Sequence, residues 1–264
     1  MPEPSPDLAL TALTDWWGEM GVAADSDVMK AYARAQTVEK ASSPKASVPL
    51  PRKAQDPEAA AADAKSVAAA CTTMEELVKA ITAFEGCPLK AGCQTTVVFD
   101  GAVGADIMVI GEGPGAEEDR TGKPFVGKAG QLLDRMLAAI NLSREANTLI
   151  TNVNYWRPPN NRNPEADELK VCRPFVDRMI EITAPKFIIA AGAVPAKALL
   201  GVSTGIMKLR GTEHEFNTPG GAEGRLFPIL HPAFLLRRPQ EKSRAWRDLQ
   251  MIERRMGEFG IKLD

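Results

Sequence analysis

Short apolar runs alternate with helix-like segments from residue 107 onward, and no other feature constrains the possible fold as strongly. Strands are predicted over residues 107–110, 148–153, 187–191 and 226–230. Helices are predicted over residues 131–142, 165–182, 195–200 and 240–259. Strands that alternate with helices are typical of a parallel sheet covered on both faces. The expected fold is therefore α/β, a three-layer αβα sandwich with a four-stranded parallel sheet and an N-terminal helical extension.

The region before this alternation divides into three parts. Leucines, two tryptophans and a methionine recur at helical spacing over residues 7–21, so an amphipathic helix is expected within 1–34. Residues 35–62 contain several prolines and few large apolar side chains, which predicts a flexible linker. The main domain is expected at 63–264. An alanine run leads into its first helix, and Thr72 and Thr73 are predicted to cap a second one.

The composition is that of an ordinary globular protein, with 44% hydrophobic and 25% charged residues. No run approaches the roughly 18 apolar residues needed to span a bilayer, and the N-terminus lacks the basic and apolar regions of a signal peptide. A cytoplasmic location without membrane association is expected. The four cysteines are too few and too scattered for a secreted disulfide scaffold, which leaves reduced thiols or a metal site.

A glycine-rich acidic loop, residues 111–119, follows the first predicted strand. Its glycines and prolines allow the backbone to turn sharply and to approach a ligand closely. The loop lies at the carboxyl end of its strand, where open α/β sheets bind their ligands. A phosphate-binding nucleotide loop is the alternative, but acids such as Glu112 and Glu117 would repel a phosphate. The loop is therefore expected to border a pocket for another kind of ligand.

Basic residues gather near the C-terminus, although the whole chain has a net charge of -2. The stretch 237–247 contains five of them, with Glu241 as its only acid: Arg237, Arg238, Lys242, Arg244 and Arg247. Local clusters of this kind, and not the net charge of the chain, determine affinity for phosphates. The alternative is the solvated face of a helix.

Four motifs follow one another from the glycine-rich loop to the end of the last predicted strand. They are GEGPG at 111–115 with the acids at 118 and 119, KPFVGKAG at 123–130, TNV at 151–153 leading to RPPNNR at 157–162, and HPAFLLR at 231–237. In this order and spacing they resemble the family 4 uracil-DNA glycosylases, over roughly residues 84–246. The resemblance implies a monomeric enzyme of base excision repair. Such an enzyme hydrolyses the N-glycosidic bond of deoxyuridine in DNA and leaves an abasic site, and the main domain is then a uracil-DNA glycosylase-like domain.

A glycosylase must flip the base out of the duplex into a pocket that stacks on its face and binds its Watson–Crick edge. Phe125 resembles the stacking residue of the family, and the alternative is an ordinary core phenylalanine. Asn152 ends a predicted strand, where its amide can accept from N3–H and donate to O4 of uracil, a pairing that cytosine does not satisfy. A strand-end asparagine is otherwise most often a turn former.

Cleavage produces an oxocarbenium-like sugar and a uracil anion. His231 resembles the family residue that hydrogen-bonds a uracil oxygen, and the backbone amides near Gly113 are expected to add to this stabilisation. Glu112 is the candidate to orient or activate the water, with Asn161 as a second, family-matched candidate. Glu118 is expected near C5 of uracil, where it would help to exclude thymine. The alternative for Glu118 is an acid favoured by the dipole at the start of a helix.

DNA binding also requires an apolar wedge to fill the space that the flipped base leaves. Leu235, with Leu236 beside it, resembles the family wedge, and Arg237 and Arg238 follow at once and are expected to contact the phosphate backbone. The alternative is that both leucines cover the core.

The cysteines depart from the family pattern. The family typically holds a [4Fe–4S] cluster with four cysteines. Here Cys87 and Cys172 keep two of these positions, whereas Phe84 and Trp156 occupy the others. The expectation is therefore a variant with no cluster and no metal, in which aromatic side chains fill the space. A different ligand set completed by Cys71 and Cys93 is the alternative.

Two further distinctions concern turnover. A related branch becomes covalently attached to DNA through a histidine in the loop after the second strand, but residues 157–164 contain no histidine. Ordinary turnover is therefore expected. The remaining alternative is a module that binds uracil-containing or abasic DNA without cleaving it.

Overall fold

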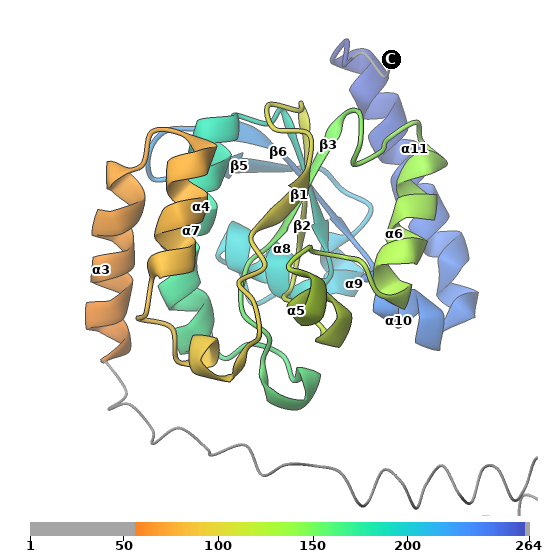
Figure 1. Ribbon diagram of the computed structural model, residues 1–264. Helices are drawn as coiled ribbons and strands as arrows, with labels where there is room; N and C mark the ends of the chain where they lie inside the picture. Colours follow the sequence, from red (N-terminus) through yellow and green to blue (C-terminus); the bar gives the residue numbers. More distant parts are fainter. Residues whose placement is uncertain (1–55, 262–264) are drawn as a thin grey trace, which may run out of the picture. The chain divides into compact units, whose positions relative to one another are not determined.

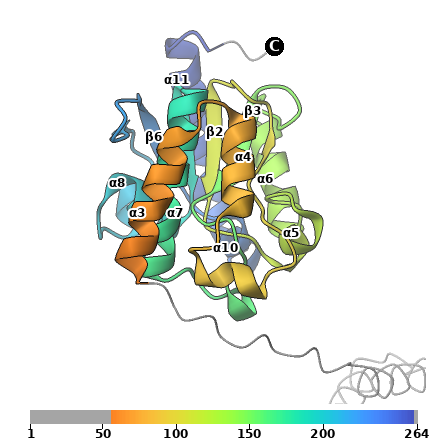
Figure 2. The same cartoon turned by 60° about the vertical axis from the view of Figure 1, so that its left-hand side comes forward.

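The computed structural model describes residues 56–261. The helix predicted over residues 7–21 and most of the expected linker lie outside this range. The first described helix, α3 (Pro57–Ala70), begins inside the segment expected to be a linker, six residues before the predicted start of the main domain at 63. Ala60, Ala64 and Ala68 are its buried positions. Small side chains at a spacing of four residues let α3 lie close against α7 (Ala166–Thr183), as Figure 2 shows.

One sheet of six strands forms the centre of the described domain, in the order β1-β3-β2-β4-β6-β5. The strands are β1 (Phe99–Gly101), β2 (Ile107–Gly111), β3 (Thr148–Asn152), β4 (Phe187–Ala191), β5 (His214–Asn217) and β6 (Glu223–Ile229). The four inner strands correspond to the four predicted ones and pair in parallel. The prediction of a purely parallel four-stranded sheet was nevertheless wrong, because β1 and β5 add antiparallel strands at the two edges.

The edge strands escaped prediction because they lack the pattern of the inner ones. All residues of β2, β3 and β4 are buried, as expected for strands covered on both faces. By contrast, β1 has three half-buried residues, and Phe216 is the only fully buried residue of β5. Such short and partly polar segments do not differ from loops in a single sequence.

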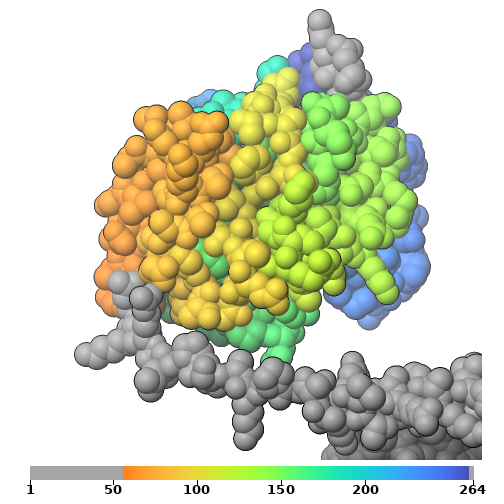
Figure 3. Space-filling model, viewed as in Figure 1, coloured from red at the N-terminus to blue at the C-terminus, as the bar shows by residue number. Residues whose placement is uncertain are grey.

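Helices cover both faces of the sheet, as Figure 1 shows. The first face carries α3, α4 (Met74–Ala83), α7 and α8 (Ala193–Leu200), and the second carries α6 (Lys128–Ala138), α10 (Pro232–Arg237) and α11 (Lys242–Glu258). Along β2, alternate residues enter the two cores, Met108 and Ile110 on the first face, Ile107 and Val109 on the second. Figure 3 shows the first helices (orange) and the segment around residue 140 (green) on opposite sides of the segment near residue 100 (yellow).

Helix α4 illustrates how local sequence fixes an element. The Thr73 hydroxyl accepts from the Glu76 amide at 3.2 Å, and the Glu76 carboxylate accepts from the Thr73 amide at 3.3 Å. This reciprocal capping box confirms the predicted N-cap. No helix of residues 56–261 is long and apolar enough to cross a membrane.

The remaining short elements cluster where the parallel strands end. They are α5 (Ala116–Thr121), α9 (Ile206–Leu209) and three 3-10 turns at Pro88–Gly92, Pro159–Asn161 and Pro239–Glu241. Because β2, β3, β4 and β6 are parallel, the loops that follow them all leave the same edge of the sheet. Ligand sites of open α/β sheets lie at this edge.

Candidate active site

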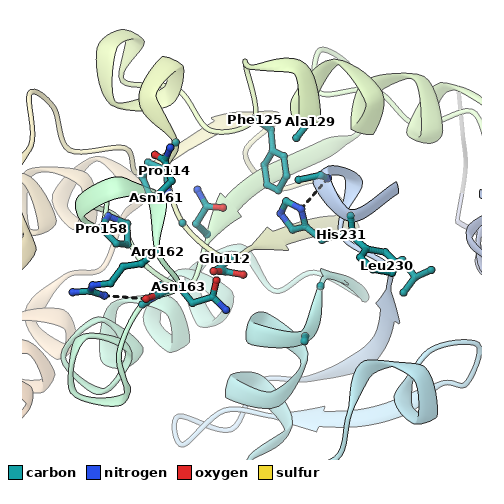
Figure 4. A pocket seen from close by; sticks show the side chains of 18 of the residues that line it. Glu112, Pro114, Phe125, Ala129, Pro158, Asn161, Arg162, Asn163, Leu230 and His231 are labelled. Atoms are coloured by element: carbon teal, nitrogen blue, oxygen red, sulfur yellow. Dashed lines mark hydrogen bonds between the residues drawn. The ribbon is translucent and has the colours of Figure 1, made fainter. Parts of the chain in front are cut away.

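A cleft of about 560 Å³ opens at the carboxyl ends of the parallel strands. Its walls come from the segments after β2, β3, β4 and β6, together with α9. Figure 4 shows side chains from these segments pointing into the cleft. Eight of the predicted site residues line it: Glu112, Gly113, Glu118, Phe125, Asn152, Asn161, His231 and Arg237. Residues that lie more than 100 positions apart in the chain are therefore brought into one site by the fold.

Glu112 is the first side chain of the cleft after β2. It is partly buried, and burial raises the pKa of its carboxyl group, an effect that the positive charge of Arg237 partly offsets. A carboxylate with a raised pKa accepts a proton more readily, which suits a general base. Gly113 follows it, and a Cβ at Gly113 would lie 3.3 Å from the Asn154 amide nitrogen, so this part of the loop packs closely on the segment after β3.

Phe125 forms one wall of the cleft with its aromatic ring. Its backbone has a φ of +54°, which is uncommon for a bulky residue, and two glycines make room for it. A Cβ at Gly111 would come within 2.4 Å of the Phe125 ring, and a Cβ at Gly130 would come within 1.9 Å of its carbonyl oxygen. These two glycines of the sequence motifs are therefore required by the position of Phe125.

Asn152 lies at the end of β3, directly opposite Gly111 of β2. Its side chain is buried and lines the cleft, and a Cβ at Gly111 would lie 2.4 Å from its amide oxygen. The absence of a side chain at Gly111 thus leaves room for both Asn152 and Phe125. A buried amide that is fixed on a strand presents a rigid donor and acceptor pair to a ligand.

His231 is the N-cap residue of α10. Its Nδ1 accepts a hydrogen bond from the Ala233 backbone amide at 3.1 Å, so the neutral ring carries its proton on Nε2. Burial, together with the positive charge of Arg237, lowers the pKa of His231 to about 4, although the negative charge of Glu118 acts in the opposite direction. The ring lies nearly parallel to that of Phe125, with centroids 5.8 Å apart. His231 is therefore a neutral hydrogen-bond donor beside the Phe125 ring at neutral pH.

Glu118 has a structural role at the start of a helix and at the turn that follows Phe125. One carboxylate oxygen accepts from the amides of Val126 and Gly127, each at 2.9 Å, and the other accepts from the Gly115 amide at 3.1 Å. Glu118 thereby caps α5 and fixes the turn that follows Phe125, in line with the helix-start alternative. Glu118 also lines the cleft, and its expected place near C5 of uracil stays a prediction.

Asn161 lines the cleft from a 3-10 turn in which both Asn160 and Asn161 have positive φ values, +55° and +53°. Asparagine tolerates this conformation better than most residues. The side-chain oxygen of Asn161 accepts from Arg157 Nε at 2.8 Å, which leaves its amide group free to donate toward the cleft.

Sequence reasoning missed several residues of the cleft, among them Asn163, Gly192 and Met207. Asn163 lies two positions after Asn161 in the same polar loop, a position that the motif comparison left out. Gly192 has a φ of +116°, and a Cβ there would lie 3.1 Å from the Cβ of His231. A glycine directly after the third inner strand was the signal that could have identified it.

The predicted DNA-contact residues do not all lie as expected. Leu235 is only 1% exposed and packs in the core on the second face, so its assignment as an exposed wedge was wrong. Leu236, the next residue of α10, is 41% exposed. A helix turns by about 100° per residue, so neighbouring leucines cannot both face inward. Arg237 and Arg238 are both exposed, and Arg237 also borders the cleft.

The four positions compared with cluster ligands all belong to the hydrophobic core on the first face of the sheet. Cys87 and Cys172 are buried and their thiols share a hydrogen bond, which lowers the pKa of Cys87 and raises that of Cys172. The Phe84 ring packs edge-on against Phe175 at a centroid distance of 5.1 Å. Trp156 is completely buried, and its indole N–H donates to the Thr96 hydroxyl at 3.1 Å.

The other two cysteines do not complete a ligand set. The Cys71 thiol donates to the Val67 carbonyl, whereas the Cys93 thiol lies within reach of the Leu89 and Arg157 carbonyls. Among residues 56–261, no three His, Cys, Asp or Glu side chains are grouped so that they could hold a metal ion. Of the four positions compared with cluster ligands, Cys87 and Cys172 carry thiols, whereas Phe84 and Trp156 carry aromatic rings.

Comparison with known proteins identifies what this arrangement is similar to. Residues 99–250 match the family model described as Uracil DNA glycosylase superfamily. The chain is 35% identical over 195 residues to the Type-4 uracil-DNA glycosylase of Pyrobaculum aerophilum, which covers 72% of this chain and 95% of that protein. It is 40% identical over 172 residues to the Type-4 uracil-DNA glycosylase of Thermotoga maritima, 65% of this chain and 85% of the relative. The corresponding protein of Archaeoglobus fulgidus is 35% identical over 184 residues, 68% of this chain and 92% of the relative.

Proposed function

The chain belongs to the uracil-DNA glycosylase superfamily, and on this premise we propose that it is a monofunctional uracil-DNA glycosylase of base excision repair. It hydrolyses the N-glycosidic bond of deoxyuridine in DNA and leaves an abasic site. The observation that carries the proposal is the meeting of Phe125, Asn152 and His231 in one cleft. An aromatic face, an amide pair and a neutral imidazole donor are the groups that a flipped uracil requires.

Base recognition rests on Phe125 and Asn152. The uracil ring stacks against Phe125, while the Asn152 amide accepts from N3–H and donates to O4. Cytosine has no proton on N3 and carries an amino group at C4, so it would leave the buried amide unsatisfied. A site built to pair with a substrate group discriminates strongly against an analogue that lacks this group.

Bond cleavage places negative charge on the leaving base. The Nε2–H of His231 donates to a uracil oxygen, and the backbone amides at Gly113 add to the stabilisation of the anion. Because the pKa of His231 is lowered to about 4, the ring acts as a neutral donor and does not protonate the base in a neutral solution.

We assign the positioning of the water that attacks the sugar to Glu112 and Asn161. Glu112 orients or activates the water, and its burial, which raises the pKa of the carboxyl group, favours proton acceptance. Asn161 provides a second polar group through its amide, since its oxygen is held by Arg157.

DNA is held at the mouth of the cleft. We assign the wedge to Leu236 in place of Leu235, because Leu236 is exposed whereas Leu235 is buried. Arg237 and Arg238 contact phosphates on either side of the flipped nucleotide. Ordinary turnover is part of this proposal, since the loop 157–164 contains no histidine that could attack the sugar.

We further propose that the enzyme works without an iron–sulfur cluster. Support comes from the two ligand positions occupied by Phe84 and Trp156, whose rings fill the space by packing. Only Cys87 and Cys172 remain there, and two thiolates cannot hold a cluster that needs four ligands. A cytoplasmic monomer completes the proposal, and sedimentation of the purified protein tests the oligomeric state.

An excision assay on the purified full-length chain tests the proposed function. Oligonucleotides that contain one uracil, thymine, hypoxanthine or no damaged base are incubated with the protein and then treated with alkali. Strand breakage at uracil and not at thymine is expected. Retention of the uracil oligonucleotide without an alkali-sensitive product would instead identify a binding module and would contradict the enzymatic proposal.

A further inference from the structure

The turn that carries Phe125 is held in an unusual conformation by a residue outside the cleft. A positive φ is disfavoured for a bulky side chain and persists only where surrounding contacts determine it. Arg144 lies in the connection between α6 and β3, 19 positions after Phe125, and does not line the cleft. Its guanidinium group nevertheless donates hydrogen bonds to two backbone carbonyls of this turn.

Arg144 uses all five of its N–H groups. Nη1 donates to the Pro124 carbonyl at 3.1 Å and to Asp100 at 2.9 Å, whereas Nη2 donates to the Phe125 carbonyl at 2.9 Å and to Asp134 at 2.7 Å. Nε donates to Asp134 at 3.1 Å. Because guanidinium is planar and its donors have fixed directions, this set of bonds fixes the two carbonyl oxygens relative to one another.

Two carboxylates hold the guanidinium itself in place. Burial alone would lower the pKa of Arg144, but hydrogen bonds to Asp134 and Asp100 outweigh it and raise the pKa. The Arg144 side chain is 12% exposed, so this group is largely shielded from solvent. Charge-assisted hydrogen bonds at such a site are stronger and more directional than those at an open surface.

The other side of the turn is held by the opposite charge. Glu118 accepts from the amides of Val126 and Gly127, directly after the carbonyls that Arg144 binds. Gly130 lies beneath, with its Cα close to the Phe125 carbonyl. A cation on the carbonyls and an anion on the amides therefore clamp the four residues 124–127.

We infer that Arg144 is a positioning residue for base stacking, which fixes the Phe125 ring in the orientation that receives the flipped base. This inference rests on the proposed function, because Phe125 has this task only if the cleft takes up a base. Arg144 itself touches neither the base nor the sugar in this account. Its effect on excision passes entirely through Phe125.

A double-mutant cycle on excision tests this dependence. Single-turnover kmax and half-saturating enzyme concentration are measured on a uracil oligonucleotide for the wild type, Arg144→Met, Phe125→Ala and the double variant. Arg144→Met is expected to lower the ratio of kmax to half-saturation roughly tenfold or more, since among its five hydrogen bonds it removes the two that hold the Pro124 and Phe125 carbonyls. In the Phe125→Ala background the same change is expected to lower it by no more than about twofold.

Arg178→Met is the matched control. Arg178 also donates to a backbone carbonyl, that of Cys71 at 2.8 Å, and pairs with Glu181 at 3.0 Å, but it lies on α7 away from the cleft. Arg178→Met is expected to lower thermal stability without changing the ratio of kmax to half-saturation of the folded protein. If Arg144→Met does not fold, the cycle is run with Arg144→Lys, which keeps the charge but cannot fork to both carbonyls.

The outcomes separate the inference from the proposed function. A wild-type chain that does not excise uracil would overturn the proposed function and the inference with it. An active wild type in which Arg144→Met is harmless, or lowers activity by the same factor with and without Phe125, would overturn the role of Arg144 alone. The role of Arg144 is supported if Arg144→Met lowers excision only when Phe125 is present and Arg178→Met leaves excision unchanged.

Discussion

Asn152 in the cleft and Trp156 in the packed region of the core on the first face lie four positions apart in the chain, and the two positions obey different constraints. Around Asn152, the absence of a side chain at Gly111 leaves room for the amide and for Phe125, and charged hydrogen bonds from Glu118 and Arg144 hold the turn that carries Phe125. Around Trp156, aromatic rings fill volume, and a single indole hydrogen bond to Thr96 satisfies the buried N–H group. Chemistry requires particular atoms at particular places, whereas stable packing depends mainly on filled space.

This difference explains why the two regions can depart from the family pattern independently. The four motifs of the cleft are all present, although two of the four cysteine positions are not cysteine. We propose that the packing of Phe84 and Trp156 stabilises this region in place of the cluster that the family resemblance implies. Substitutions in the packed region should therefore change stability, and substitutions in the cleft should change excision.

The largest expected effect comes from Trp156→Ala. Removing a fully buried indole should lower the free energy of unfolding by about 3–5 kcal/mol. The excision rate of the protein that remains folded should change by less than about twofold, because Trp156 does not line the cleft. Urea denaturation and single-turnover excision at low temperature measure the two quantities. A large loss of rate with unchanged stability would break the comparison.

His231→Ala should produce the reverse pattern. Loss of the donor to the uracil anion is expected to lower kmax by roughly 10²–10³-fold, as for other groups that stabilise a developing negative charge. Thermal stability should change little, since the ring provides a single capping contact, from Ala233. Full activity in this variant would remove His231 from the site.

The same histidine predicts how stability depends on pH. In the unfolded chain His231 binds a proton near pH 6.5, whereas the folded protein binds it only near pH 4, so acid favours the unfolded state between these values. The full stability is therefore present above pH 6.5, and the free energy of unfolding falls by roughly 3 kcal/mol as the pH is lowered to about 4, because the unfolded chain then binds the proton more tightly. Urea midpoints of the wild type and His231→Ala across this range isolate the effect from the carboxyl groups. Parallel curves for the two proteins would contradict it.

The smallest effect is expected at the mouth of the cleft. Leu236→Ala should lower excision from double-stranded DNA by roughly tenfold, because an exposed wedge is needed only to displace a stacked base. Excision from single-stranded DNA should be almost unchanged. Leu235→Ala is the matched control, since it removes a buried leucine and should lower stability without changing the ratio between the two substrates.

The sequence predicted those parts of the fold that have a strong local pattern. Each inner strand contains a run of buried residues, and each was found, whereas β1 and β5 are short and partly exposed and were missed. Eight residues of the cleft were predicted from their motifs, whereas Asn163, Gly192 and Met207 were missed. The direction of Leu235 was wrong because α10 has only six residues, too few to show a helical period.

The supporting contacts could not be predicted in the same way. Arg144 binds backbone carbonyls, and carbonyls leave no trace in the identity of the residues that carry them. Glu118 matched both a role in the pocket and a role at a helix start, and its three amide partners show the second of these. Such contacts depend on the path of the backbone, which a single sequence does not specify.

The most direct test measures iron content and uracil excision on the same sample of the full-length chain, expressed with added iron and purified without oxygen. We predict uracil excision at full rate with no stoichiometric iron and no visible absorption, and an unchanged rate after treatment with a chelator. A sample that contains a bound cluster, or whose excision rate rises and falls with its iron content, would contradict the account.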